Sequence, residues 1–200
     1  MFLQNSQRKI EEEFLKLTEK LGADREPLKT ICEKLNGCDR DLGLAMKYLY
    51  VTAPYSDLVN YSFEDIQDFA SHGLFLYNTL ERVKELPEEM FLNYILDHRV
   101  NEEEVLPCRS FFWNELKDRI EGKNAKDAAI EVNYWCAEEA TYHSGDDRTL
   151  PALTVYRRGY GRCGEESVFL VNALRSVGIP ARQVYVPRWS HCDDNHAWVE

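Results

Sequence analysis

Gly161-Arg-Cys-Gly-Glu-Glu-Ser167 and His196-Ala-Trp-Val-Glu200 are the two segments that decide the fold of this 200-residue chain. The first lies at the start of a predicted helix over 164–177, which is apolar on most sides and which Gly178 ends. Residues 181–187 and 196–200 are rich in β-forming residues and are separated by a polar loop, which predicts two strands. A helix packed on an antiparallel pair can bring its first residue close to a residue of a neighbouring strand.

The chain before this region is predicted to be helical. Apolar residues recur at steps of three and four from Ile10 to Leu21, and Gly22 ends that pattern. Ser62, with Asp65 three residues later, is typical of a helix N-terminus. We therefore expect helices over residues 10–21, 24–35, 39–51, 62–86, 88–98, 109–121 and 125–143.

Composition narrows the class of protein. A hydrophobic content of 44% is enough for a sizeable core. The net charge of −11 argues against a role in nucleic-acid binding, because phosphate binding needs clustered positive charge. No apolar run is long enough for a membrane span, and none follows the N-terminus as in a signal peptide, so we expect a cytoplasmic protein. The six cysteines form no CxxC pair, and we expect reduced thiols rather than disulfides or a structural zinc site.

Cys163 and His196 are the candidate catalytic residues. The start of a helix carries partial positive charge and free N–H groups, both of which favour a thiolate, the reactive form of cysteine. Gly161 and Gly164 would leave room for a substrate carbonyl near the backbone, with the Cys163 N–H as an oxyanion donor. A thiolate paired with His196 would be a nucleophile with its base. Taken singly, each residue is by default assigned a structural role, as a buried cysteine or a satisfied histidine.

These segments, together with Leu174-Arg-Ser-Val-Gly-Ile-Pro-Ala-Arg182, resemble the transglutaminase-like superfamily, which includes transglutaminases, bacterial cysteine proteases and peptide N-glycanases. The resemblance is strong over about 45 residues and looser over 125–155. It implies an α+β fold, in which a mostly helical N-terminal part precedes a papain-like core with its cysteine-bearing helix on an antiparallel sheet. We expect a small helical region over 1–55, a helical region over 56–124 and the core over 125–200.

The resemblance implies Cys163 as the nucleophile and His196 as the general base, with no cofactor and no metal. It also implies an orienting aspartate on the strand after Glu200, since Glu200 itself lies about 13 Å along the strand from His196 at about 3.3 Å per residue. We therefore expect a sheet that is incomplete at the C-terminus of this chain. Trp135 could wall the site or donate to the oxyanion, although a core role is the more common one for such a tryptophan. The loop 191–196 contains metal-capable atoms, but a polar rim of the site is the favoured interpretation.

The predicted function is that of a cysteine enzyme that cleaves or transfers an amide or peptide bond of a protein or peptide substrate through a thioester. The resemblance to bacterial members favours a hydrolase, a protease or deamidase. The alternatives are a non-catalytic binding module with a relic site, a crosslinking transglutaminase, and a peptide N-glycanase-like amidase; the missing CxxC motifs argue against the last.

Overall fold

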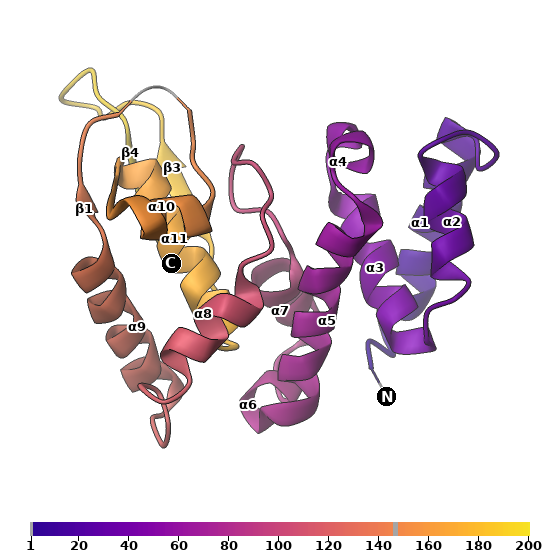
Figure 1. The fold of residues 1–200 in the computed structure, drawn as a ribbon, viewed down its shortest axis with the longest axis horizontal. Helices are drawn as coiled ribbons and strands as arrows, with labels where there is room; N and C mark the ends of the chain where they lie inside the picture. Colours follow the sequence, from indigo (N-terminus) through magenta and orange to yellow (C-terminus); the bar gives the residue numbers. More distant parts are fainter. Residues whose placement is uncertain (1, 146–147) are drawn as a thin grey trace. The chain divides into compact units, whose positions relative to one another are not determined.

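The computed structural model describes residues 2–145 and 148–200, and the chain forms two compact units, Met1–His98 and Arg99–Glu200 (Figure 1). This division coincides with neither of the boundaries expected at 55/56 and 124/125. The segment 144–151 is described only in part, because residues 146 and 147 lie outside the described residues. In the described part of the chain, no helix combines the length and the apolar character that crossing a bilayer requires.

The first unit is helical throughout. Its central helix α3 packs against α1 and α5 and buries Ala45, Met46 and Leu49 completely. The Asp39 carboxylate accepts from the first N–H groups of α3, and Ser62 and Asp65 form the predicted capping box of α5. Its helices are α1 (Gln7–Leu21), α2 (Leu28–Leu35), α3 (Arg40–Thr52), α4 (Tyr55–Asn60), α5 (Phe63–Thr79), α6 (Glu81–Lys84), α7 (Glu88–Phe91) and a π-helical turn (Leu92–Leu96).

Two helices of the first unit are shorter than predicted. The helix expected from residue 24 begins only at Leu28, directly after Pro27, whose missing N–H suits it to a helix start. The helix expected to reach residue 86 ends at Thr79, because Leu80 is extended, and α6 follows as a separate turn.

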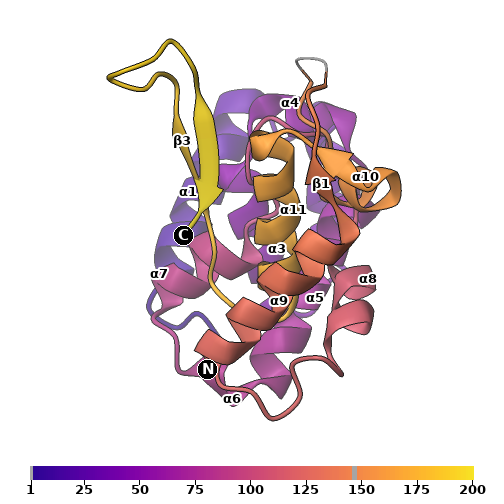
Figure 2. The ribbon, with the colours of Figure 1, turned by 90° about the vertical axis from the view of Figure 1, so that its left-hand side faces the viewer.

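The second unit is built around α11 (Cys163–Ser176). Figure 2 shows this helix between the β3–β4 pair and the helices α9 and α10, and it contacts all four of these elements and α8. β3 and β4 pair antiparallel, with Val184 opposite Trp198 and Val186 opposite His196. The remaining elements are α8 (Arg109–Leu116), α9 (Ala125–Glu139), β1 (Thr141–Tyr142), α10 (Ala152–Arg158), β2 (Tyr160–Gly161), β3 (Gln183–Val186) and β4 (His196–Val199). The expected α+β class, with the cysteine-bearing helix on an antiparallel pair, is confirmed.

An aromatic cluster forms the core beneath α11. Phe169 of α11 contacts the rings of Phe112, Trp135 and Tyr156 at centroid distances of 5.5, 5.4 and 6.1 Å. Trp135 is 2% exposed and stacks on Tyr156 with an interplanar angle of 25°. These ring contacts fix the position of α11 in the second unit. Cys163 is the first residue of this helix and therefore lies at one end of a rigid element.

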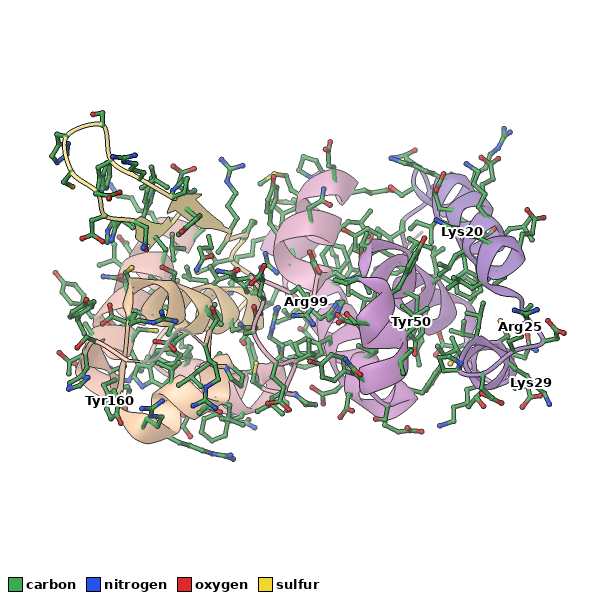
Figure 3. The ribbon with its side chains drawn as sticks, turned by 90° about the horizontal axis from the view of Figure 1, so that it is seen from above. Lys20, Arg25, Lys29, Tyr50, Arg99 and Tyr160 are labelled. Atoms are coloured by element: carbon green, nitrogen blue, oxygen red, sulfur yellow. The ribbon has the colours of Figure 1, made fainter. Side chains whose placement is uncertain are left out.

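Arg175, near the other end of α11, is a buried polar anchor. Its Nε donates to the carbonyl of Ala181 at 2.9 Å, and its Nη1 donates to the carbonyl of Arg99 at 2.8 Å; Arg99 is labelled in Figure 3. The guanidinium therefore ties the first residue of the second unit and the approach to β3 to the same helix.

Candidate active site

Cys163 is the first residue of α11 and is half-buried. The residue that fixes this helix start is Glu165, which is 3% exposed. Its carboxylate accepts from the backbone N–H of Arg162 at 2.7 Å and lies 3.4 Å from the Arg162 Nε. A buried carboxylate in the first turn satisfies an N–H group at the helix start and interacts favourably with the helix dipole. Cys163 is thereby held between Arg162, whose N–H is bonded to Glu165, and the rest of α11.

Gly161 is required by this same contact. A Cβ at position 161 would lie 2.9 Å from the Cβ of Glu165, closer than real Cβ contacts allow. Gly164 is different, because a Cβ there would meet nothing within 4 Å. We predicted both glycines as room for a substrate, and the structure gives Gly161 a packing reason and leaves Gly164 open on the wall of a hollow.

Cys163 and His196 line the same hollow, which has a volume of about 1010 Å³. A second hollow of about 350 Å³ shares four residues with the first: Cys163, Glu166, His196 and Ala197. Most of the lining of the larger hollow is polar, and it comes from the loop before α8, from the segments around β1 and α11, and from the β3–β4 hairpin: Val100, Asn101, Glu102, Tyr142, Thr149, Arg162, Cys163, Gly164, Glu166, Gln183, Tyr185, Asp194, Asn195, His196 and Ala197.

Gln183 joins three walls of this hollow. Its Nε2 donates to the carbonyl of Gly164 at 2.9 Å, and its Oε1 accepts from the Nδ2 of Asn101 at 2.8 Å. The buried carboxylate of Glu103 in turn accepts from the N–H groups of Val100 and Asn101 at 2.9 and 2.7 Å. The loop 100–102 is therefore a fixed wall, and β3 is bonded to the start of α11.

His196 is the first residue of β4, and its ring contacts two indoles. The imidazole lies 6.1 Å from the ring of Trp189 and 6.2 Å from that of Trp198, with interplanar angles of 31° and 25°. Among the residues that the structure describes, no hydrogen bond joins His196 to Cys163. The strand alternation places His196 and Trp198 on one face of β4 and Ala197 on the other. The structure thus brings the two predicted residues to one hollow without forming the bonded pair.

Glu200 is occupied by other partners. Its carboxylate accepts from Arg182 Nη2 at 2.9 Å and forms an ion pair with that guanidinium. The Arg182 guanidinium and the Trp198 indole N–H together hold the pKa of Glu200 below its usual range. Glu200 is therefore engaged by Arg182 at the end of the β3–β4 pair.

Trp135 lies in the aromatic core and is absent from the described residues that line either hollow. The structure therefore places it in the core role that we considered alongside the site wall. For the loop 191–196, no group of three or more His, Cys, Asp or Glu side chains in the described chain is arranged to hold a metal ion.

The charge of the larger hollow comes mainly from carboxylates. Glu102, Glu166 and Asp194 line it, and Glu166 lies three residues after Cys163 on the same face of α11. Burial, with the nearby Glu165 charge, raises the pKa of the Glu166 carboxyl. The sequence did not predict Glu166 as part of the wall of this hollow.

Other wall residues were also beyond sequence reasoning. Three of them come from segments about 20 to 60 residues before the Gly161–Ser167 segment, and these segments carry no motif of their own: Asn101, Glu102 and Tyr142. Only Gln183 had a usable signal, because it lies in a predicted strand next to the helix start, where a side-chain amide can reach a helix N-terminus.

Comparison with known proteins gives one match. Residues 114–200 match the family model described as the transglutaminase-like superfamily. No curated protein and no solved structure matches the chain.

Proposed function

We propose that the protein is a cysteine enzyme acting on amide or peptide bonds, because residues 114–200 match the transglutaminase-like superfamily. The observation that carries the proposal is the shared hollow, which holds Cys163 at the first turn of a capped helix and His196 at the start of a neighbouring strand. The reaction class is acyl transfer through a thioester, with water as the favoured acceptor.

The steps follow from ordinary thiol chemistry. The Cys163 thiolate attacks the substrate carbonyl carbon, and the developing oxyanion faces N–H groups at the start of α11, which have no partner within the helix. As the C–N bond breaks, protonated His196 gives its proton to the leaving amine or ammonia. Neutral His196 then takes a proton from water, which attacks the thioester carbonyl and releases the acid and the Cys163 thiolate.

This sequence requires the imidazole within hydrogen-bond reach of the thiol in the substrate complex. Catalytic hydrogen bonds are often long without substrate and tighten when it binds. In this structure the His196 ring instead contacts the Trp189 and Trp198 rings.

A second candidate function rests on that same contact. A binding module that keeps the hollow but not turnover would leave the His196 ring in its contacts with the Trp189 and Trp198 rings. The two functions differ in whether His196 changes the reactivity of Cys163.

The deciding experiment is the rate of iodoacetamide alkylation of Cys163 against pH, with each cysteine resolved by mass spectrometry, in the wild type and in His196→Ala. The exposed Cys192 is an internal reference, and Cys136 is a negative control because burial raises the pKa of its thiol. We expect fast labelling of Cys163 that persists to about pH 5–6 and is lost in the variant. Labelling that rises only near pH 8.5, the ordinary range of a free thiol, and that ignores the variant would favour the binding module.

The acceptor is tested separately, by incubating the protein with glutamine-containing peptides, with and without a primary amine, and following their masses. Hydrolysis of the backbone, conversion of glutamine to glutamate, and incorporation of the amine identify a protease, a deamidase and a transglutaminase, respectively.

A further inference from the structure

We propose that the hollow beside Cys163 selects a peptide substrate that carries a lysine or arginine side chain next to the reacting amide, and that Glu166 is the main specificity-determining residue. The inference rests on the proposed function, because it assigns the substrate class of that same site. It is carried by the charges, the aromatic rings and the position of Glu166 in the walls.

The residues that line the larger hollow carry more negative than positive charge. Three carboxylates, those of Glu102, Glu166 and Asp194, line the larger hollow. Of the described residues in this lining, Arg162 alone has a permanent positive charge. Its guanidinium is already engaged with the buried carboxylate of Glu165 at 3.4 Å and with the carbonyl of Arg148 at 3.0 Å. His196 is charged only when protonated. A substrate entering this hollow therefore meets a negative potential.

Two exposed tyrosine rings add an independent feature. Tyr142 and Tyr185 are 63% and 55% exposed, and both line the same hollow. Burial of apolar area does not account for rings that remain this exposed. The face of a tyrosine ring attracts ammonium and guanidinium groups, and lysine and arginine side chains also offer apolar stems that cover such rings. Carboxylates together with open aromatic faces are the surroundings that a cationic side chain prefers.

Glu166 is the carboxylate closest in sequence to the reacting sulfur. Positions 163 and 166 are neighbours on one helix face, where Cβ atoms lie about 5–6 Å apart. Glu166 is half-buried and belongs to both hollows, as do Cys163 and His196. A cation that pairs with Glu166 therefore lies within one residue's length of the bond that Cys163 attacks, whichever hollow it occupies.

The test uses thiol reagents of different charge and compares their rate ratios between variants, so that differences in reagent size cancel. Methanethiosulfonates with a trimethylammonium-ethyl, methyl or sulfonatoethyl group are reacted with the full chain at low salt and about pH 8, where carboxylates are ionised. Rates at Cys163 and at the exposed Cys192 are resolved by mass spectrometry. The variants are Glu166→Gln and Glu102→Gln, and Glu121→Gln is the matched control, since Glu121 is exposed and lines neither hollow.

We expect the cationic reagent to react with Cys163 faster than the neutral one, and the anionic reagent to react more slowly than the neutral one. Glu166→Gln should lower the cationic-to-neutral rate ratio about 3- to 10-fold, the effect of one unit charge at about 6 Å in a partly aqueous site. Glu102→Gln should lower it less, and Glu121→Gln should leave it unchanged. Added salt should compress all of these differences. An unchanged ratio in Glu166→Gln, or a preference for the anionic reagent in the wild type, overturns the proposal.

A second probe tests the substrate class directly. Two peptide fluoromethyl ketones, with lysine or norleucine beside the reactive carbonyl, should label Cys163 at different rates in the wild type, lysine faster, and at similar rates in Glu166→Gln. The two proposals fail in distinguishable ways. If His196→Ala does not change the rate at which the neutral reagent reacts with Cys163, the enzymatic function is contradicted. The role of Glu166 is decided only by the cationic-to-neutral rate ratio.

Discussion

Glu165→Ala is the substitution that most directly tests how Cys163 is held. In the folded protein the Glu165 side chain is 4% exposed, and its Oε2 accepts from the Arg162 N–H at 2.7 Å, directly before Cys163. Alanine removes this acceptor and one of the two negative charges of the first turn, and it leaves the Arg162 N–H, directly before α11, to find water.

The expected cost is the sum of two effects. A hydrogen bond to a charged group contributes about 1.5–3 kcal/mol, and a carboxylate in the first turn of a helix contributes about 0.3–1 kcal/mol. The Arg162 side chain is 28% exposed and can be rehydrated, so we add nothing for the ion pair. The free energy of unfolding should fall by about 2–4 kcal/mol. Glu165→Gln keeps one acceptor oxygen and should lose about half as much, because charge-assisted bonds are roughly twice as strong as neutral ones.

Tryptophan fluorescence during urea unfolding is a suitable assay, since all four tryptophans (113, 135, 189 and 198) lie in the second unit. Glu121→Ala, at an exposed site, is the control. A loss for Glu165→Ala below about 0.5 kcal/mol, the usual range of neutral surface substitutions, would refute the assignment of Glu165 as the support of the helix start.

Three further predictions follow from other contacts. Gly161→Ala forces a methyl group to within 2.9 Å of the Glu165 Cβ, so we expect a loss of about 1–3 kcal/mol in urea unfolding and slower alkylation of Cys163; normal values for both would contradict the packing argument. Trp135→Ala should cost about 3–5 kcal/mol, measured by circular dichroism, as expected for a core ring; an unchanged stability with altered Cys163 reactivity would point to the site wall instead. Burial raises the pKa of Glu166, so the folded state binds that proton more tightly than the unfolded state and loses stability as pH rises through the carboxyl range. Glu166→Gln should therefore be more stable than the wild type at neutral pH, with the difference shrinking toward pH 4; urea midpoints that differ more at low pH would reverse this sign.

The elements that the sequence predicted best are those with strong local signals. The capping box of Ser62 and Asp65, the stop at Gly22 and the start of α11 each follow from contacts within one or two turns of a helix. Such contacts are encoded by residues three or four positions apart, and they are therefore legible without tertiary information.

The elements that were missed depend on distant partners. β1 has only Thr141 and Tyr142 and exists because it pairs with Tyr160 and Gly161, and two-residue strands leave no periodicity to detect. Helix α10 was also missed, because a helix of seven residues directly after Pro151 is too short to show a clear helical periodicity. For the site, Cys163 and His196 could be placed by motif, but the acidic and aromatic walls come from segments that only the fold brings together.

The bond from Arg175 to the carbonyl of Arg99 has a practical consequence. A polypeptide beginning at residue 99 would have its first residue tied to the central helix rather than trailing as a loose end. It would carry Cys163, the hollow and the aromatic core in 102 residues, counted from 99 to 200. Expressed alone with isotope labels, such a fragment would be small enough for every amide of the nucleophile region to be followed by solution spectroscopy while ligands are titrated.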